Sequence, residues 1–308
     1  MAARTEPEPD AAATQADRWT VGRLLTWTTD YLKQHGADSP RLDAEVLLAH
    51  ARGCPRIELY TNFDDEAVEP VRTAFRELVR RRAEGTPVAY LVGYREFYSL
   101  RFRVTPDVLI PRPETESLVV ALRDWAKTRP ANSQPLRIAD VGTGSGVLAV
   151  CAAKYLPTSR VTAIDISAAA LEVARANAKE LGVADRVTFV ESDLLGGSPP
   201  EAQFDLVISN PPYISTAEMA ELPPHIRSYE PKLALDAGDR GMDVIERLIP
   251  QAAERLTPAG QLFFEISPML EAAARSAVEA ESRLWLAPTI KDLAAQARVI
   301  AAARVGRL

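Results

Sequence analysis

The sequence predicts an α/β fold, in which a doubly wound parallel sheet with helices on both faces follows a small helical bundle. From about residue 114 onward, short β-branched strands alternate with helical segments. Residues 18–85 instead contain only amphipathic helical patterns with short connections between them. The length of 308 residues is enough for two such domains.

The helical region at residues 18–85 should form three main helices, over residues 20–36, 39–53 and 69–85. The first helix has apolar residues recurring on one face, which is expected to point into the bundle core. These residues are Val21, Leu24, Leu25, Thr28 and Leu32. Short connections between amphipathic helices are typical of a bundle, so this region is predicted to be a separate helical domain.

Two further segments flank this bundle. Residues 1–17 are rich in charged and small residues and lack the apolar stretch of a signal peptide, so a disordered tail is expected. Residues 86–113 are aromatic and β-branched and are interrupted by glycine and proline. This composition predicts a β-hairpin-like linker that leads into the α/β domain at residues 114–308.

The α/β domain alternates strands and helices. The predicted strands are residues 136–142, 161–167, 186–193, 204–210, 261–267, 283–292 and 297–305, and the predicted helices are 147–156, 168–182, 241–256 and 267–280. In sheets of this kind, ligands bind beyond the carboxyl ends of the strands, where the strand order reverses. Residues that follow the strands are therefore the candidates for a functional site.

Composition excludes several classes of protein. The net charge is −6 and neither half of the chain is basic, which argues against a protein that coats nucleic acid. Two cysteines and three scattered histidines do not predict a metal site or a disulfide framework. No apolar run approaches the ~20 residues that span a bilayer, and a cytoplasmic location is expected.

A glycine-rich segment follows the first predicted strand and precedes a predicted helix. Its candidate cofactor-binding residues are Gly142, Thr143, Gly144, Ser145 and Gly146. Glycines allow a tight turn and a close approach of the backbone to a ligand at a helix N-terminus. The spacing is G-x-G-x-G, whereas the dinucleotide fingerprint has G-x-G-x-x-G, so a ligand other than a dinucleotide is predicted.

Two carboxylates follow the next two strands. Asp165 ends the second strand, where a carboxylate can accept hydrogen bonds from both hydroxyls of a ribose. Asp193 ends the third strand and is positioned for the amine of an adenine, with the adjacent Leu194 in the same site. Together with the glycine loop, these residues describe S-adenosylmethionine as the cofactor. The predicted domain is thus a Rossmann-like, class I S-adenosylmethionine-dependent methyltransferase domain.

The fourth strand ends in Asn210-Pro211-Pro212-Tyr213, the candidate acceptor site. An amide nitrogen is a poor nucleophile, so a site that methylates it must hold both N–H groups and aim the nitrogen. The side-chain oxygen of Asn210 can accept one N–H and the carbonyl of Pro211 the other. Tyr213 is expected to cover the flat face of the acceptor group. Asn210, Pro211 and Tyr213 are therefore the candidate catalytic residues, and Asn210 also borders the cofactor.

These motifs together resemble the HemK/PrmC family, the N5-glutamine methyltransferases of peptide chain release factors. The resemblance covers nearly the whole chain after the tail. It includes the helical domain, the linker that continues to residue 116, the glycine loop, Asp165, residues 210–214, Glu230-Pro231, Ala234-Leu235 and Gly238. The linker is the most family-specific part, because Asn-Pro-Pro-Tyr is shared with adenine-N6 methyltransferases.

The resemblance implies a function and a partner. The acceptor would be the glutamine of the Gly-Gly-Gln motif in class 1 release factors, the proteins of translation termination, and the helical domain would dock them. Asn210, Pro211, Pro212 and Tyr213 would hold the glutamine, and Phe97 would help to wall a narrow tunnel around it. Neither stable nucleic-acid binding nor a membrane is expected.

Some positions depart from the family pattern, and they leave fine substrate contacts open. They are Ser267 and Leu270, where glycine and glutamine are usual, Ala295, where glycine is usual, and Arg240, where aspartate is usual. The sequence also contains a basic cluster, Arg76, Arg80, Arg81 and Arg82. We expect these side chains to lie on a solvent-exposed helix face rather than to contact a partner.

Three alternative functions stay open at this point. A methyltransferase for a ribosomal-protein glutamine would share the chemistry. An adenine-N6 nucleic-acid methyltransferase would need a basic groove, which the charge distribution does not predict. A binding module with an inactive site is disfavoured by the intact glycine loop, Asp165 and Asn210.

Overall fold

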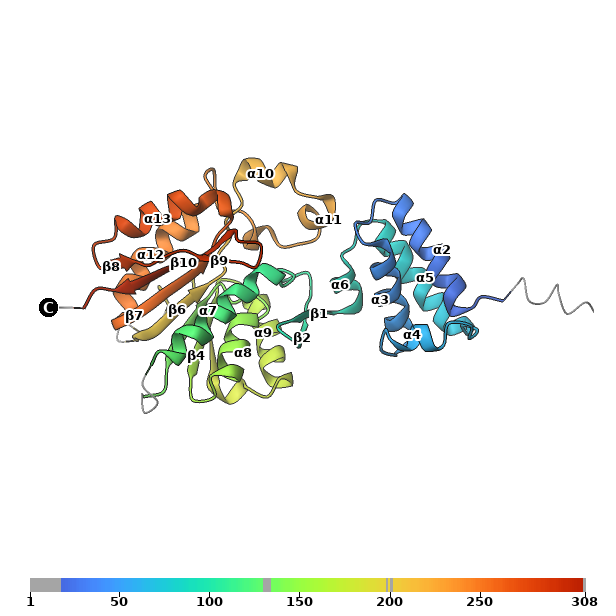
Figure 1. Ribbon diagram of the computed structural model, residues 1–308, viewed down its shortest axis with the longest axis horizontal. Helices are drawn as coiled ribbons and strands as arrows, with labels where there is room; N and C mark the ends of the chain where they lie inside the picture. Colours follow the sequence, from blue (N-terminus) through green and yellow to red (C-terminus); the bar gives the residue numbers. More distant parts are fainter. Residues whose placement is uncertain (1–17, 130–133, 198, 200–201, 307–308) are drawn as a thin grey trace, which may run out of the picture. The chain divides into compact units, whose positions relative to one another are not determined.

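The computed structural model describes residues 18–129, 134–197, 199 and 202–306 (Figure 1). The tail expected at residues 1–17 lies outside the described residues. The chain divides into two compact units, Met1–Val92 and Gly93–Leu308. In the described part of the chain, no helix has both the length and the apolar character needed to cross a membrane.

The first unit is helical, as predicted. Its helices are α2 (Val21–Gln34), α3 (Pro40–Arg52), α4 (Glu58–Thr61), α5 (Glu69–Ala83) and α6 (Val88–Val92). Every residue of the predicted apolar face of α2 is buried, including the hydroxyl-bearing Thr28. Leu47 and Leu48 of α3 and Phe75 of α5 also belong to the core of this unit. The helical periodicity therefore predicted α2, α3 and α5 and the side of α2 that packs inward, but not the short helices α4 and α6.

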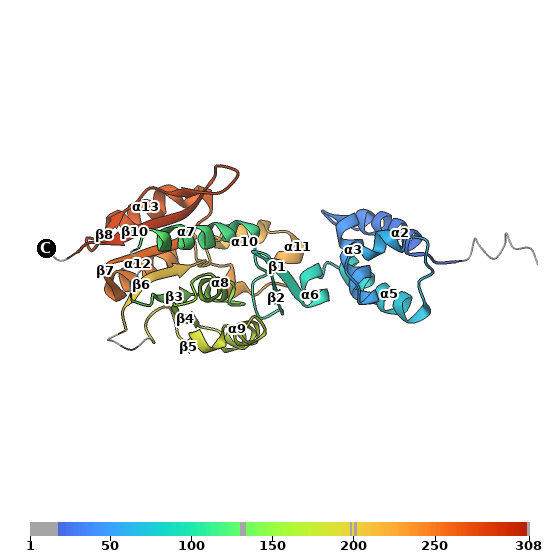
Figure 2. The ribbon, with the colours of Figure 1, turned by 60° about the horizontal axis from the view of Figure 1, so that its bottom comes forward.

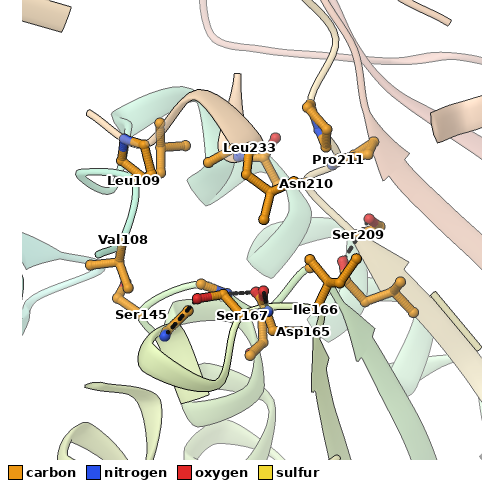
Figure 3. Close-up of a pocket in the computed structure, with 18 of the residues that line it drawn as sticks. Val108, Leu109, Ser145, Asp165, Ile166, Ser167, Ser209, Asn210, Pro211 and Leu233 are labelled. Atoms are coloured by element: carbon orange, nitrogen blue, oxygen red, sulfur yellow. Dashed lines mark hydrogen bonds between the residues drawn. The ribbon is translucent and has the colours of Figure 1, made fainter. Parts of the chain in front are cut away.

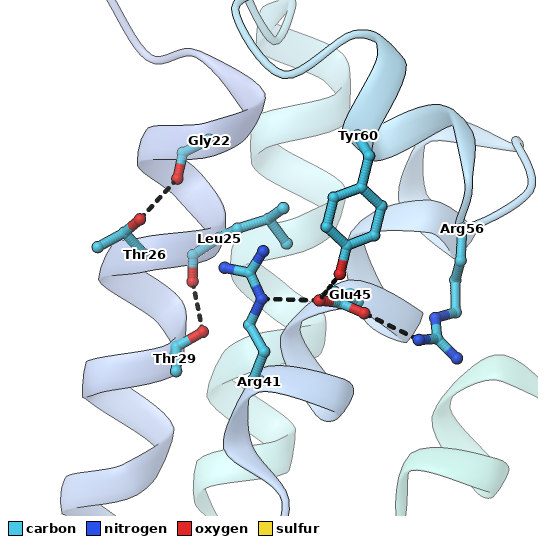
Figure 4. Close-up of polar contacts among 8 residues, drawn as sticks. All are labelled: Gly22, Leu25, Thr26, Thr29, Arg41, Glu45, Arg56 and Tyr60. Atoms are coloured by element: carbon cyan, nitrogen blue, oxygen red, sulfur yellow. Dashed lines mark hydrogen bonds and ion pairs between the residues drawn. The ribbon is translucent and has the colours of Figure 1, made fainter.

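Glu45 of α3 is a buried carboxylate that links several parts of this unit (Figure 4). It accepts hydrogen bonds from Arg41 at 2.7 Å, from Arg56 at 2.9 Å and from the hydroxyl of Tyr60. Burial alone would raise the pKa of Glu45, but these three donors lower it below its usual value. The carboxylate thus stays ionised and holds α3 and α4 together.

The basic cluster on α5 differs from the prediction at one position. Arg80 pairs with Glu77 and Glu84 on the exposed face of the same helix, as a solvated face requires. Arg82 instead reaches Asp43 of α3 at 2.8 Å, and both side chains are mostly buried. Arg82 is therefore a tie between two helices. The clustering of charges in the sequence could not predict this ion pair, because it does not show which helices pack against each other.

Residues 86–113 contain the predicted hairpin, with a helix before it. Strands β1 (Tyr94–Phe97) and β2 (Leu100–Arg103) pair antiparallel, and Phe97 faces Leu100 across a two-residue turn. Residues 88–92 form α6 rather than an extended segment. They belong to the helical unit, whereas the hairpin belongs to the second unit. The boundaries predicted at residues 85 and 113 stay a prediction.

The second unit contains a single large sheet (Figures 1 and 2). The strand order is β5-β4-β3-β6-β7-β10-β8, with β9 paired to β10. The strands are β3 (Arg137–Val141), β4 (Arg160–Asp165), β5 (Val187–Glu191), β6 (Phe204–Ser209), β7 (Leu256–Glu265), β8 (Leu284–Leu286), β9 (Ile290–Lys291) and β10 (Ala297–Arg304). From β3, the next two strands in sequence, β4 and β5, are added on one side, whereas β6 pairs with β3 on its other side. The strand order therefore reverses between β3 and β6.

One part of the sheet corrects the prediction of a purely parallel arrangement. The strands from β5 to β7 are parallel, but β10 runs antiparallel to β7 and to β8. The chain passes from β8 through β9 to β10 without a crossover helix. Such short connections join antiparallel strands, whereas parallel neighbours need a long crossover.

Helices cover both faces of this sheet. Helices α7 (Glu116–Lys127), α8 (Val147–Tyr155) and α9 (Ala168–Glu180) contribute to one apolar cluster, and α12 (Asp243–Arg255) and α13 (Glu271–Glu279) contribute to the other. Successive residues of β3 alternate between the clusters, with Ile138 in the first and Ala139 in the second. Two buried faces explain why the strands read as continuous apolar runs.

Shorter helices complete the second unit. They are α10 (Thr216–Glu221), α11 (Pro224–Arg227) and the 3-10 turns η1 (Pro113–Thr115), η2 (Ala184–Arg186), η3 (Lys232–Ala234) and η4 (Pro268–Leu270). Helices α10 and α11 lie in the long connection between β6 and α12. This connection directly follows the predicted acceptor segment, so its residues are available to enclose the site.

Candidate active site

The predicted site segments meet at the carboxyl edge of the sheet. The glycine loop follows β3, and Asn210 follows β6, the strand next to it. A Cβ added to Gly142 would lie 3.9 Å from the backbone oxygen of Asn210, so the two segments are in contact. Asp165, the last residue of β4, lies across the pocket from Asn210 (Figure 3).

These segments surround a pocket of about 250 Å³. Its walls combine the glycine loop, the ends of β4, β5 and β6, the segment before α7 and the segment around η3. The lining residues are Asp107, Val108, Leu109, Pro111, Thr115, Val141, Gly142, Thr143, Gly144, Ser145, Val147, Leu148, Asp165, Ile166, Ser167, Ala170, Ser192, Asp193, Leu194, Ser209, Asn210, Pro211, Pro212, Pro231, Leu233, Ala234, Val244 and Arg247.

The glycines of the loop are required for two different reasons. Gly144 and Gly146 have φ angles of +53° and +83°, in the left-handed region that glycine adopts without strain. A Cβ on Gly146 would lie 3.0 Å from the Cβ of Ala174, so α9 packs directly against the loop. A Cβ on Gly144 would meet nothing within 4 Å. At this position, therefore, the backbone is open to the pocket that it lines.

Asp140, on β3, connects the glycine loop to the helix that follows it. Its Oδ2 accepts the Thr143 hydroxyl at 2.6 Å and the N–H of Ala149 at 2.9 Å. Asp140 is completely buried, and burial raises the pKa of its carboxyl to about 7. This carboxyl therefore supports the strand-to-helix turn, a role that its position inside the motif did not reveal.

Asp165 is already engaged with the loop. One carboxylate oxygen accepts the N–H of Gly144 at 2.8 Å, and the other accepts the N–H of Ser167 at 2.9 Å. Burial raises the pKa of Asp165, and these backbone hydrogen bonds oppose that change. Each oxygen keeps a further lone pair, so the carboxylate can also accept from a ligand hydroxyl.

Asp193 and Leu194 both line the pocket, beyond the end of β5. Strand β5 ends at Glu191, two residues earlier than the predicted strand. The carboxylate of Asp193 pairs with Arg247 of α12, and about half of each side chain is exposed. An exposed pair of this kind contributes at most about 1 kcal/mol, so a ligand could displace the arginine at little cost.

The acceptor segment lines the pocket through its first three residues, Asn210, Pro211 and Pro212. The side-chain Nδ2 of Asn210 donates to the hydroxyl of Thr115 at 3.0 Å. Thr115 is only 1% exposed, so its hydroxyl is a fixed partner rather than a mobile surface group. Thr115 thereby fixes the Nδ2 end of the Asn210 amide, and Oδ1 can accept a hydrogen bond from a ligand.

Tyr213 is not among the residues that line the pocket, and its predicted role in covering the acceptor stays a prediction. Its ring packs against the apolar cluster that includes α12, and its hydroxyl donates to Glu265 at 3.2 Å. Burial, followed by the charge of Glu265, raises the pKa of this hydroxyl well above its usual value. A buried phenol needs a hydrogen-bond partner, and here that partner lies beneath the site rather than in it.

Phe97 packs in the core of the second unit, and its predicted role in walling a tunnel around the acceptor stays a prediction. It is 2% exposed and packs edge-to-face against Phe102 of the partner strand, with ring centroids 6.1 Å apart. Both rings belong to the apolar cluster that includes α7 and α8. The aromatic character of the linker thus serves the core, and Phe97 is not among the residues that line the pocket.

Sequence reasoning missed several residues of the pocket wall. Val108, Leu109 and Thr115 come from the end of the linker, and Leu233 comes from η3 (Figure 3). The only signal for them was their place in segments that resemble the family pattern. Glu230 joins these two walls, since it accepts the N–H of Ile110 at 3.1 Å and pairs with Arg112 at 2.6 Å.

The group that this pocket fits is a nucleoside with a polar tail. The Asp165 carboxylate has free lone pairs that can accept from the hydroxyls of a ribose. The open glycine backbone and the apolar walls from Ile166 and Leu194 leave room for the rest of a nucleoside. Among the described residues, no three His, Cys, Asp or Glu side chains are grouped to hold a metal ion. The Asp165 carboxylate, the open backbone at Gly144 and the apolar walls of the pocket fit S-adenosylmethionine.

Comparisons with known proteins match both halves of the chain to families of known domains. Residues 23–93 match the family model of the PrmC N-terminal domain, and residues 126–222 match that of the methyltransferase small domain. A release factor glutamine methyltransferase of Rhodopirellula baltica is 51% identical over 282 residues, covering 92% of this chain and 95% of the relative. One of Nitratidesulfovibrio vulgaris is 39% identical over 92% of this chain and 95% of its own length.

Solved structures support the fold. The hMettl16 catalytic domain aligns with a TM-score of 0.52 over 74% of this chain and 82% of that chain, at 15% identity. At this identity the likeness concerns the fold alone. It agrees with an α/β fold for the second unit.

Proposed function

Because the chain belongs to the family of release factor glutamine methyltransferases, we propose that it methylates the side-chain amide nitrogen (N5) of a glutamine in peptide chain release factors. The methyl donor is S-adenosylmethionine, and the acceptor is the glutamine of the Gly-Gly-Gln motif in class 1 factors. The observation that carries the proposal is the placement of Asn210 and Pro211 on the wall of the pocket built by the glycine loop and Asp165.

In the cofactor half of the pocket, different residues contact different parts of S-adenosylmethionine. Asp165 accepts the ribose hydroxyls with the lone pairs that Gly144 and Ser167 leave free. The glycine loop lets the backbone approach the amino-acid tail, and Asp193 and Leu194 border the adenine. When bound, S-adenosylmethionine supplies an electrophilic methyl group carried on a sulfonium sulfur.

The acceptor half positions a weak nucleophile. The Asn210 Oδ1 and the Pro211 carbonyl each accept one N–H of the glutamine amide, which fixes the plane of that amide. These hydrogen bonds hold the amide nitrogen in line with the methyl group of the donor. The reacting atoms are then oriented before the reaction, which lowers the entropic part of the barrier. The nitrogen loses one proton to water after it gains the methyl group, so these residues need only accept hydrogen bonds. Pro212, rigid and in the pocket wall, fixes the backbone that presents the Pro211 carbonyl.

The helical unit supplies the docking surface for the release factor in this proposal. All residues that line the pocket are numbered 107 or higher, so the chemistry belongs to the second unit. The matched PrmC N-terminal domain at residues 23–93 supports a role for the first unit in choosing the protein acceptor. The proposed division is a docking domain at residues 18–85, a linker at 86–113 and a methyltransferase domain at 114–308.

Asn210→Ala tests the proposal. The acceptor amide would keep only the hydrogen bond to Pro211 and could rotate about it, so turnover should fall by about 10²–10³-fold. Affinity for S-adenosylmethionine, measured by calorimetry, should change little. The readout is mass spectrometry of a release factor, in which one added methyl group is sought on the glutamine of Gly-Gly-Gln.

Two controls accompany this test. A release factor with glutamate in place of that glutamine should gain no methyl group from the wild-type enzyme. Asn210→Asp keeps an acceptor oxygen, and it should retain more activity than Asn210→Ala if accepting an N–H is the main role. Methylation by Asn210→Ala at the wild-type rate would show that Asn210 does not hold the acceptor.

A further inference from the structure

The helical unit contains a groove that the proposed reaction does not use. It has a volume of about 500 Å³, and all the residues that line it are numbered between 19 and 80. Most of them belong to two helices, α2 and α5, and none is shared with the pocket at the carboxyl edge of the sheet. The groove therefore belongs to the helical unit alone.

Two buried polar atoms of this groove lack hydrogen-bond partners among the described residues. The first is the hydroxyl of Thr28 on α2, a residue that is only 1% exposed. Two other threonines of α2, Thr26 and Thr29, donate their hydroxyl hydrogens to carbonyls one turn earlier, at 2.9 and 2.6 Å (Figure 4). The second atom is Nε of Arg72 on α5. Buried polar groups are normally hydrogen-bonded, so this pair points to a ligand group that enters the groove.

The two atoms define the chemistry of that ligand group. Nε of Arg72 can only donate, and the Thr28 hydroxyl can donate as well. Two donors, one from each helix, suit a single group with acceptor oxygens, which is a carboxylate or a peptide carbonyl. The guanidinium of Arg72 is charged, and its hydrogen bonds are strongest with an ionised acceptor, which favours the carboxylate.

Aromatic rings form an apolar wall of the groove. Trp27 and Tyr31, one turn apart on α2, stack with ring centroids 5.0 Å apart and an interplanar angle of 10°. Trp19 meets Trp27 edge-on, with centroids 6.5 Å apart. Trp27 nevertheless leaves 51% of its surface exposed. Grouped, exposed aromatic rings beside arginines are typical of the central residues of protein–protein interfaces.

The charged residues of the groove favour an acidic partner. Three arginines and one glutamate line it, namely Arg72, Arg76, Arg80 and Glu69. Arg72 pairs with Glu69, and Arg80 pairs with two glutamates close to it in the chain. Arg76 is exposed and forms no salt bridge with any described residue, so its charge is available. A nucleic acid would need a row of such cations along its phosphates, which a single arginine does not provide.

We infer that this groove is the docking site for an acidic segment of the release factor, in which an apolar side chain accompanies a carboxylate. The inference rests on the proposed function and names the surface by which the helical unit binds the protein acceptor. The carboxylate accepts from Thr28 and Arg72, and the apolar side chain packs against Trp27. Arg76, solvent-exposed in the free chain, adds the electrostatic attraction that steers the encounter.

Arg76→Gln and Arg81→Gln form a matched pair for testing this inference. Each removes one positive charge from α5, but only Arg76 lines the groove. Arg76→Gln should raise the KM for an intact release factor about 3- to 10-fold and weaken its dependence on salt, because a charge that attracts the partner is lost. Arg81→Gln should leave this KM within about twofold of the wild type. In both variants, kcat and the rate with a short Gly-Gly-Gln peptide should match the wild type, since the pocket is unchanged.

Thr28→Val separates binding from stability. Valine keeps the shape of threonine and removes a hydroxyl that has no partner in the described part of the chain, so the free energy of unfolding should stay equal or rise. The KM for the release factor should nevertheless rise about 5- to 10-fold, the scale of one hydrogen bond. A merely structural role of Thr28 would instead lower stability and leave KM unchanged.

A binding measurement does not depend on methylation. The chain contains four tryptophans, Trp19, Trp27, Trp125 and Trp285, so labelling with fluorotryptophan gives four ¹⁹F signals in the NMR spectrum. Unlabelled release factor should shift the Trp27 signal, which is assigned by its loss in Trp27→Phe. The signal of Trp285, which is 62% exposed on β8, should stay constant.

The outcomes separate this inference from the proposed function. If the release factor shifts the Trp27 signal in the wild type but not in Thr28→Val, and its glutamine stays unmethylated, the docking site holds and the acceptor atom is wrong. If the wild type, Arg76→Gln and Thr28→Val methylate the factor with the same KM, the docking site is overturned and the proposed function stands. Equal changes in Arg76→Gln and Arg81→Gln would also overturn it, because the groove would then not be the feature that matters. So would a Trp27 signal that shifts with single-stranded oligouridylate, or with enzyme concentration alone, and not with the release factor.

Discussion

Ala295 stands in a backbone conformation that suits glycine. It has a φ of +59° in the turn between β9 and β10, and its N–H donates to the Asp292 carbonyl at 2.9 Å. The related family usually has glycine at this position. A non-glycine residue in the left-handed region costs about 1–2 kcal/mol, because its Cβ crowds the following carbonyl. The departure from the family pattern is thus a local strain at a residue that does not line the pocket.

Ala295→Gly should therefore raise the free energy of unfolding by about 0.5–1 kcal/mol, after allowing for the greater entropy of glycine in the unfolded chain. Urea denaturation measures this change. The neighbouring Ala294 has no positive φ. Ala294→Gly is the matched control, and it should lower stability by a few tenths of a kcal/mol. If both variants lose stability equally, the turn does not store the proposed strain.

Single residues also show what the sequence could predict about the site. The glycine loop, Asp165 and Asn210 follow strand ends, and the carboxyl ends of neighbouring parallel strands meet at one edge. Thr115 has no such signal, because its contact with Asn210 depends on how segments far apart in the sequence come together. The burial of Phe97 and the contact of Tyr213 with Glu265 could not be predicted either, because residue type does not distinguish an aromatic in a pocket from one in a core.

At the scale of elements, Asn177 connects three parts of the second unit. It lies on α9 and is completely buried. Its side chain accepts the N–H of Arg103 at 2.7 Å, donates to the Arg103 carbonyl at 3.0 Å and donates to the Ser145 carbonyl at 2.8 Å. One amide thus ties the end of β2 and the glycine loop to the same helix, so the hairpin and the cofactor loop share a support.

Asn177→Ala should lower the free energy of unfolding by about 2–4 kcal/mol, because it leaves buried backbone groups without partners. Calorimetric affinity for S-adenosylmethionine should fall as well, since the Ser145 carbonyl is no longer held. Lys179→Ala, on the exposed face of the same helix, serves as the control and should change stability by less than about 0.5 kcal/mol. Stability within that same range for Asn177→Ala would show that the three hydrogen bonds are replaced by water.

Elements were predictable where periodicity is strong. The strands and helices from β3 to α9 follow the predicted segments closely, because two-sided burial leaves continuous apolar runs between turns. Helix α6 was missed since it is only five residues long and lies among aromatic residues that favour strands. The antiparallel direction of β10 was missed because strand direction depends on the connection, not on the composition of the strand.

At the scale of the whole molecule, each of the two units has its own buried core. The helical unit buries Leu25, Leu47 and Phe75, and the second unit has apolar clusters on both faces of its sheet. The chain divides between Val92 and Gly93, and the pocket lies wholly on the C-terminal side of that division. Binding of the cofactor and docking of the protein acceptor can therefore be tested separately.

Removal of residues 1–92 should leave affinity for S-adenosylmethionine within about threefold of the full chain, because every residue that lines the pocket is kept. Methylation of an intact release factor should fall by roughly 10²-fold in kcat/KM, which corresponds to a loss of ~2.7 kcal/mol of docking energy. A short Gly-Gly-Gln peptide cannot use the docking surface, so both proteins should methylate it at the same low rate. Mass spectrometry measures both acceptors. Full activity of the truncated protein on the intact factor would place the docking surface in the second unit instead.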